Sequence, residues 1–465
     1  MLYSIIILVY SILHTQEEVT LAFTFKGGIH VEEYKYKGAC PTETMPNPAT
    51  VKISMTQHNG TPCIPSVKKG DRVRIGQIIG DAPEDALGCP VHASVSGTVL
   101  DIEELPVSSG VPEKAVVIEN DEKDELDPSV VPFTGSIREL SPEDIISRVR
   151  RAGICDGTLP AYAKISAACG RIEYLIVNCV ERDPFVTSCR RLISEHPEKV
   201  VRGTKILMRA IRAPQAYIAV ESAVTGNVRR LKRLCEGDRL ISVQTVKSKY
   251  PHGDERQLIY ALTGREVPAD RCPEDAGCVV LDARTCAEVY DAIATGMPSV
   301  RCTVTVSGDC IAEPKELSVP VGAAVSELID FCGGSAKAHD KLVIGTAMTG
   351  EAQSRADIPV KKSTSAVLLL SKKYTKEPKG TADCIRCGRC VRSCPMRLMP
   401  AYIAMSVRAD DMKGAERFGA VSCTECGVCS YVCPAKVELV QYVRRAKEQI
   451  LAEKERAQDT ETDAK

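Results

Sequence analysis

The chain has 465 residues, of which 44% are hydrophobic and 26% are charged, and its formal net charge is −1. This is the composition of an ordinary globular protein, and the length is enough for about three or more domains. The near-neutral charge, the absence of Trp and an aromatic content of 4% argue against nucleic-acid binding. That function needs a basic surface or aromatic rings on which bases stack.

The chain begins with an apolar run, Leu2–Leu13, of 12 residues. It is shorter than the stretch of about 20 residues that crosses a bilayer. It also lacks the basic flank and the small-residue cleavage site of a signal peptide. We therefore expect translation to start near Val19 or Leu21, in preference to a membrane-surface anchor at this end.

Residues 21–120 are expected to form a hybrid of barrel and sandwich made of short β-strands. Val67–Gly80 and Cys89–Glu104 alternate apolar and polar residues around glycine turns. The two stretches resemble the halves of biotinyl- and lipoyl-type carrier domains. The intervening turn, Ala82–Ala86, contains no lysine to carry a prosthetic group. We therefore expect a docking module here, not a swinging-arm carrier.

Residues 121–136 are acidic and contain proline, as a linker does. From residue 137 to about residue 300, strand and helix patterns alternate, which predicts a Rossmann-like α/β domain with a parallel sheet. Ligands bind at the carboxyl ends of the strands in such sheets, where the polar run from Asn178 to Asp183 is expected to lie. The predicted strands are Ile172–Asn178, Ala216–Glu221, Leu240–Lys247 and Cys278–Ala283, and the predicted helices are Lys199–Arg212, Val228–Cys235 and Thr285–Thr295.

The remaining segments complete a multidomain α+β protein. Residues 301–352 return to short strands around one helix, Ala324–Cys332, which predicts a small β-grasp-like unit. Ser371–Asp383 is a basic linker. Residues 374–450 contain helical patterns between and after two cysteine motifs, and Lys436–Gln458 predicts an amphipathic helix that packs on this last domain.

Eight of the 22 cysteines form two copies of the run C-x₂-C-x₂-C-x₃-C-P. Bacterial two-cluster ferredoxins hold [4Fe–4S] clusters with this run. Three thiolates of each run converge on one cluster, while the cysteine before the proline departs on a helix and ligates the other cluster. We therefore expect an electron carrier with one cluster on Cys384, Cys387, Cys390 and Cys433, and a second on Cys423, Cys426, Cys429 and Cys394.

Paired structural zinc sites are the alternative, because four thiolates also bind Zn²⁺. Zinc sites rarely use a third C-x₂ step followed by C-x₃-C-P, and the pattern occurs twice here, so the iron–sulfur interpretation is favoured. The other fourteen cysteines are scattered singly and are expected to be small buried residues. His58 and His92 are expected to be core or surface residues. Thiolate clusters require a reducing compartment, which predicts an intracellular protein.

Several longer strings resemble the RnfC family, the C subunits of the Rnf ion-translocating electron-transport complex. They are F-K-G-G-I-H (Phe25–His30), Q-H-N-G-T-P (Gln57–Pro62), H-A-S-V-S-G-T-V (His92–Val99) and Y-P-H-G-D-E-R-Q-L-I-Y-A-L-T-G-R-E-V-P (Tyr250–Pro268). The resemblance covers nearly the whole chain from Phe25. It implies, in order, a barrel–sandwich hybrid, a flavin/NADH domain akin to the flavoprotein subunit of complex I, a soluble-ligand-binding β-grasp (SLBB) domain and a helical two-cluster ferredoxin domain.

The resemblance also implies FMN and NAD(H) as cofactors. The family's flavin loop is similar to G-x-G-G-A-G-F-P-T, whereas the aligned stretch Ala152–Lys164 is shorter, lacks the double glycine and carries Asp156. Gly157 and the cation of Lys164 are the candidates to bind the flavin phosphate. The family's N-x-x-E-x-E-P and Y-P-x-G-x-E strings imply further contacts to flavin or to NADH. Ordinary strand-end caps are the alternative role for some of these residues, which are Asn178, Glu181, Asp183 and Glu255.

By resemblance, the protein is a peripheral subunit on the cytoplasmic face of the membrane, bound to integral-membrane subunits and exchanging electrons with ferredoxin or another carrier. It is expected to pass electrons between NAD(H) and its partners through FMN and the two clusters. One alternative is a relay and docking subunit that has lost flavin and NADH. Another is a soluble flavoprotein similar to cobalamin reductases, against which the N-terminal barrel–sandwich segment argues.

Overall fold

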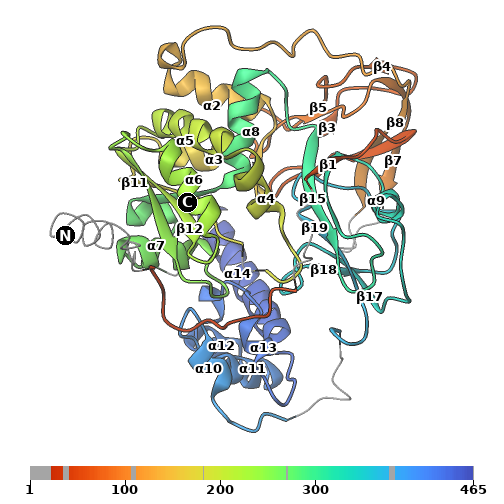
Figure 1. Cartoon of the computed structure of the whole chain (residues 1–465). Helices are drawn as coiled ribbons and strands as arrows, with labels where there is room; N and C mark the ends of the chain where they lie inside the picture. Colours follow the sequence, from red (N-terminus) through yellow and green to blue (C-terminus); the bar gives the residue numbers. More distant parts are fainter. Residues whose placement is uncertain are drawn as a thin grey trace, which may run out of the picture.

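The computed structural model describes residues 22–34, 41–105, 112–181, 183–268, 271–375 and 383–463. The apolar run Leu2–Leu13, the expected starts at Val19 and Leu21, and residues 376–382 of the predicted basic linker lie outside these ranges. Four units follow one another along the chain (Figure 1). Among the described residues, no helix combines the length and the apolar character that a bilayer crossing requires.

The first unit consists of two small antiparallel sheets that enclose one core. The larger sheet has the order β2-β8-β7-β4 and the smaller one β3-β5-β6. Alternate residues of the strands point inward, and their side chains, such as Val51, Ile53, Ile79 and Ile118, are fully buried. The strands are β2 (Thr50–Ser54), β3 (Ile64–Pro65), β4 (Arg72–Val73), β5 (Ile78–Asp81), β6 (Val91–His92), β7 (Gly97–Leu105) and β8 (Glu113–Asn120).

The second unit is a parallel four-stranded sheet with the order β13-β12-β11-β14. Its strands confirm the four predicted from the sequence: β11 (Tyr174–Cys179), β12 (Gln215–Glu221), β13 (Ile241–Val246) and β14 (Cys278–Asp282). The helices are α2 (Pro142–Arg151), α3 (Ala161–Ala168), α4 (Ser188–Glu195), α5 (Pro197–Ile211), α6 (Thr225–Leu234), α7 (Glu255–Thr263) and α8 (Ala283–Ala294).

The two faces of this sheet bury different sets of side chains. Leu175 and Val177 of β11 point into a large core shared with α2, α3, α5 and α8, whereas Ile176 points to the opposite face, which α7 covers. Helices α5 and α8 pack very closely, because a Cβ at Gly203 would lie 1.8 Å from the carbonyl oxygen of Cys286. The carboxyl end of β11 lies between the starts of α7 and α8, because Asn178 bonds to Gly253 before α7 and to Asp282 before α8.

The third unit is a mixed sheet with the order β1-β16-β15-β19-β17-β18 and one helix, α9 (Val325–Phe331). It extends past the predicted limit of residue 352, since β19 supplies a fully buried strand in its interior. The strand β1 joins it from a distant part of the sequence and pairs with β16 in parallel. The strands are β1 (Glu43–Thr44), β15 (Arg301–Ser307), β16 (Lys315–Pro320), β17 (Lys341–Ile344), β18 (Glu351–Gln353) and β19 (Ala366–Leu370).

The fourth unit is helical and lies beneath the parallel sheet in Figure 1. Its long C-terminal helix, α14 (Leu439–Asp463), packs against α11 and α12 through Val443 and Ile450, as the predicted apolar face requires. The other helices are α10 (Arg389–Ser393), α11 (Pro400–Arg408), α12 (Met412–Arg417) and α13 (Val428–Tyr431).

An N-terminal strap, residues 22–34, passes between the parallel sheet and the helical unit (Figure 1). Phe23 pairs with Val246 at the end of β13, and Ile29 pairs with Tyr250. Further along, the amide of Gly28 donates to the carbonyl oxygen of Ser393 in the helical unit at 2.8 Å. The strap therefore joins the two units by main-chain hydrogen bonds.

Candidate functional site

The two cysteine runs fold in the same way. In each run a glycine with positive φ, Gly388 or Gly427, begins a short helix that carries the third cysteine. The first cysteine of each run accepts a backbone N–H two residues later. The distances are 3.4 Å from Arg386 to the Sγ of Cys384 and 3.3 Å from Glu425 to the Sγ of Cys423. Glycine suits the left-handed turns that bend the chain around a common centre.

Each run contributes three thiols to its own pocket and one thiol to the pocket of the other run. Cys384, Cys387 and Cys390 line one pocket together with Cys433. Cys423, Cys426 and Cys429 line the other together with Cys394. The structure thus brings together the two sets expected from the sequence. Within the described ranges, no three His, Cys, Asp or Glu side chains are grouped to hold a single metal ion; the thiols border cavities instead.

The thiols themselves fit the ligand role. Burial raises the pKa of Cys426 to about 12, so the free side chain is a protonated thiol. Metal ligation requires the thiolate, so iron binding would release this proton. We refer to the pocket of Cys394, Cys423, Cys426 and Cys429 as the inner pocket, and to that of Cys384, Cys387, Cys390 and Cys433 as the outer pocket.

The inner pocket lies against the parallel-sheet unit. The hydroxyl of Tyr250 donates to the carbonyl oxygen of Cys426 at 2.8 Å. A Cβ at Gly27 of the strap would lie 2.5 Å from the carbonyl oxygen of Cys394. The outer pocket reaches the surface, where Cys387 is exposed and Ile385 is 65% exposed.

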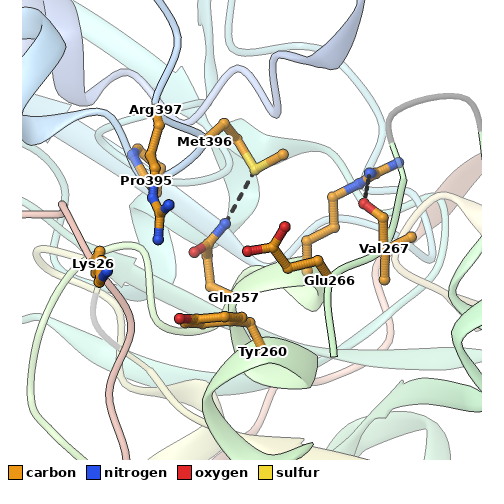
Figure 2. A pocket seen from close by; sticks show the side chains of 9 residues that line it. Lys26, Gln257, Tyr260, Glu266, Val267, Pro395, Met396 and Arg397 are labelled. Carbon is orange, nitrogen blue, oxygen red and sulfur yellow. Dashed lines mark hydrogen bonds between the residues drawn. The ribbon is translucent and has the colours of Figure 1, made fainter. Parts of the chain in front are cut away.

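Figure 2 shows a surface pocket at the junction of the parallel-sheet unit and the helical unit. Here α7 faces the segment Pro395–Arg397, which follows the inner-pocket Cys394. The side-chain amide of Gln257 lies 3.1 Å from the sulfur of Met396 and bridges the two units. Lys26 of the strap forms another wall of this pocket. Three segments distant in sequence therefore meet beside the inner pocket.

At the carboxyl edge of the parallel sheet, Lys164 lies in a closed network of carboxylates. Its Nζ donates to Asp156 at 2.8 Å, to Glu255 at 3.1 Å and to the carbonyl oxygen of Val280 at 2.7 Å. Burial alone would lower the pKa of Lys164, but the two carboxylates raise it above its ordinary value. An ammonium has three N–H donors, so all three are used within the chain.

The side chain of Asn178, at the end of β11, is also held by hydrogen bonds within the chain. Its amide nitrogen donates to the carbonyl oxygen of Gly253 and to Asp282, both at 3.1 Å, and its oxygen accepts from the amide of Val180. Burial raises the pKa of Asp282 to about 6, helped by the neighbouring charge of Asp156. These contacts fix the ends of β11 and β14 relative to the loop that precedes α7.

Glu181 and Asp183 lie apart from the Lys164 network. Glu181 is buried and caps the start of α4, accepting hydrogen bonds from the amides of Cys189 and Arg190 at 2.7 and 3.2 Å. Asp183 lies near Tyr250, whose pKa is raised first by burial and then by this carboxylate. Glu181 therefore has the capping role that the sequence left open as an alternative.

A cavity of about 600 Å³ opens beside the sheet edge, between the parallel and the mixed sheets. Gly157, at the turn of the hairpin β9 (Cys155–Asp156) and β10 (Leu159–Pro160), and Asn178 line it, together with Asp282 and Arg284 at the start of α8. Its size is within the usual range for cofactor sites. Sequence reasoning missed Asp282 and Arg284, although they lie at and just after the carboxyl end of a predicted strand, Cys278–Ala283.

Other sequence predictions are confirmed in the core. His58 and His92 are buried, with 6% and 3% of their surfaces exposed. Of the thirteen described cysteines outside the two runs, only Cys272 is exposed, and most are fully buried as small apolar residues.

Three family models match the chain. Residues 23–123 match an RnfC barrel sandwich hybrid domain, residues 146–291 a Nuo51 FMN-binding domain, and residues 383–437 a 4Fe-4S dicluster domain. The first match falls on the all-β unit, and the last match falls on the helical unit that contains the two cysteine runs. The middle match spans the parallel sheet from α2 to α8.

Several curated proteins are similar to nearly the whole of this chain. The C subunit of the Na⁺-translocating ferredoxin:NAD⁺ oxidoreductase complex of Acetobacterium woodii is 39% identical over 436 residues, which are 93% of this chain and 98% of that protein. The C subunit of the proton-translocating ferredoxin:NAD⁺ oxidoreductase complex of Clostridium ljungdahlii is 38% identical, over 93% and 95% of the two chains. The C subunit of the ion-translocating oxidoreductase complex of Rhodobacter capsulatus is 36% identical, over 92% and 83%.

Proposed function

Because the chain belongs to the RnfC family, the C subunits of ion-translocating oxidoreductase complexes, we propose that it is the peripheral electron-transfer subunit of such a complex. It passes electrons between NAD(H) and its partner subunits, with a flavin in the parallel-sheet unit and two [4Fe–4S] clusters in the helical unit. A flavin is suited to this position because it exchanges a hydride on one side and single electrons on the other.

The observation that carries this proposal is the exchange of cysteines between two pockets. Four thiols border each pocket, and in each the fourth comes from the other run. This is the ligand arrangement of two-cluster ferredoxins, and it supports the assignment of all eight cysteines as iron ligands.

The positions of the two pockets suggest the order of the electron route. The inner pocket touches Tyr250 and the strap, so its cluster exchanges electrons with the parallel-sheet unit. The outer pocket has an exposed thiol at Cys387 and is lined by the exposed arginines Arg386 and Arg389, with the exposed Arg392 in the adjoining helix α10. Its cluster exchanges electrons with the next carrier, for which an acidic protein such as a ferredoxin is the complementary partner.

The all-β unit and the mixed-sheet unit serve to attach the protein to its partner subunits. Apart from β1 at its edge, the mixed sheet has the strand order β16-β15-β19-β17-β18. This order of a hairpin, a central last strand and a second hairpin supports the β-grasp (SLBB) assignment. The domains then span about residues 21–120, 137–300, 301–370 and 383–450. With integral-membrane subunits as partners, the protein binds the cytoplasmic face of the membrane.

The test is anaerobic preparation of the full chain, followed by iron analysis and titration with NADH. We expect about eight iron atoms per chain and bleaching of the cluster absorbance by NADH once flavin is bound. Zinc in place of iron would refute the electron-carrier function. Clusters that dithionite reduces but NADH does not, in protein that binds no flavin, would instead establish the relay and docking subunit.

A further inference from the structure

The carboxylate of Asp156 occupies a cradle of donors that is typical of phosphate sites. Its Oδ2 accepts from the ammonium of Lys164 at 2.8 Å. Its Oδ1 accepts from the hydroxyl of Thr285 at 2.6 Å and from the backbone N–H of Asp282 at 2.9 Å, where α8 begins. A lysine, a hydroxyl and an amide at a helix N-terminus together favour a bound anion. Here the chain supplies that anion itself.

The carboxylate is held firmly in this position. Asp156 is only 7% exposed and belongs to the tight hairpin β9–β10. The amide of Asn59, in the all-β unit, donates to the carbonyl oxygen of Thr158 in the same hairpin at 2.6 Å. Burial would raise the pKa of Asp156, yet Lys164 and the other donors lower it below its ordinary value. The cradle therefore holds a charged carboxylate.

The surroundings also disfavour a second anion. Glu255 lies 3.1 Å from Lys164, and Asp282 is a third carboxylate close enough for its pKa to be affected by the charges of Asp156 and Lys164. Arg284, another cation of the cavity wall, pairs with Glu288 at 3.6 Å. One ammonium thus faces three carboxylates, and a phosphate dianion brought close to them would be repelled.

We propose that Asp156 is a resident anion that takes the place of the flavin phosphate, so that the parallel-sheet unit binds the flavin without using its phosphate group. The proposal rests on the function proposed above, in which this unit holds a flavin. It departs from the expectation that Lys164 binds the phosphate. It makes Asp156 a specificity-determining residue: riboflavin and FMN bind the wild-type chain with similar affinity.

The test is a fluorescence-quenching titration of the anaerobic full chain with riboflavin and with FMN. In the wild type, the two dissociation constants should agree within about threefold. In Asp156→Ala, FMN should gain at least about tenfold over riboflavin, the equivalent of one charge-assisted hydrogen bond. Because Glu255 still pairs with Lys164 in this variant, the ammonium keeps a partner and the unit should fold. Asp101→Asn, at an exposed carboxylate of β7, is the matched control and should keep the wild-type ratio.

Two further measurements keep the outcomes distinct. Asp156→Asn retains the shape of the side chain but removes its charge, and should give an intermediate preference for FMN. If neither flavin binds, the flavin part of the proposed function fails, and inorganic phosphate then tests the cradle alone. Phosphate should raise the melting temperature of Asp156→Ala but not that of the wild type. The proposal is overturned if the wild type already prefers FMN by about tenfold or more, or if phosphate affects both proteins equally.

Discussion

Glu316 gives the clearest expected link between pH and stability. It lies in β16, 1% exposed, and accepts hydrogen bonds from Thr305 at 2.7 Å and from Thr187 of the neighbouring parallel-sheet unit at 3.0 Å. Burial is the main cause that raises the pKa of Glu316 to about 8, and the charge of Glu181 adds to it. At neutral pH the folded protein therefore keeps a proton on this carboxyl group, whereas the unfolded chain has lost it.

The sign and size of the effect follow from this difference. Since the folded state binds more protons between about pH 4.5 and about pH 8, its stability falls as the pH rises through that window. The gap between the folded value of about 8 and the ordinary value of 4.5, at about 1.36 kcal/mol per pH unit, corresponds to about 3 to 5 kcal/mol. Glu316→Gln keeps the shape of the neutral acid and does not ionise, so it should lack this loss.

The assay compares urea unfolding of the wild type and of Glu316→Gln, anaerobically, from about pH 5 to about pH 9. The wild type should lose stability relative to the variant as the pH rises, and the difference should level off above about pH 8. Glu119→Gln, at an exposed position of β8, is the control and should follow the wild type. Parallel pH profiles for the wild type and Glu316→Gln would refute the reasoning, because they would mean that Glu316 is ionised in the folded protein.

Three further predictions concern the electron route. Cys433→Ser should lower the iron content from about eight to about four atoms per chain and leave NADH reduction of the remaining cluster intact. Cys394→Ser should lose the same amount of iron and also block NADH reduction. Equal loss of NADH reduction in both variants would contradict the exchange of cysteines. Gly27→Ala should destabilise the contact of the strap with the helical unit by more than about 1 kcal/mol, because Gly27 has a φ of +76° and its Cβ would lie 2.5 Å from the carbonyl oxygen of Cys394. A lower thermal midpoint of iron loss measures this effect, and an unchanged midpoint would show that the strap contact is dispensable. Arg386→Gln combined with Arg389→Gln should slow electron exchange with an acidic ferredoxin at low salt, and the two rates should converge at high salt; a difference that is independent of salt would argue against docking by charge.

The sequence predicted the elements that repeat a short physical pattern. The four strands of the parallel sheet were found because each is a run of apolar residues, and β11 and β12 begin within two residues of their predicted starts. The grouping of the eight cysteines around two pockets was also predictable, because thiol spacing in such runs reflects the size of a cluster. In both cases the information lies within a few consecutive residues.

Contacts between distant segments could not be predicted in this way. The pairing of β1 with β16, the interior position of β19 and the strap between two units depend on residues far apart in the sequence. The surroundings of Asp156 depend on Thr285 and Asp282, which are more than a hundred residues away. The resemblance to the family placed Asp156 in the loop that holds the flavin phosphate; in the structure, its carboxylate accepts hydrogen bonds from Lys164, Thr285 and Asp282.

The string F-K-G-G-I-H now has a physical explanation that is independent of family resemblance. Gly27 and Gly28 both have positive φ, and at each position a Cβ would lie within 2.6 Å of a backbone oxygen, that of Cys394 on one side and that of Tyr250 on the other. Any larger residue would push apart the inner pocket and the parallel sheet. The rate of electron transfer depends on the distance between cofactors. In the proposed route, these two adjacent glycines set that distance by allowing close contact with Cys394 on one side and with Tyr250 on the other.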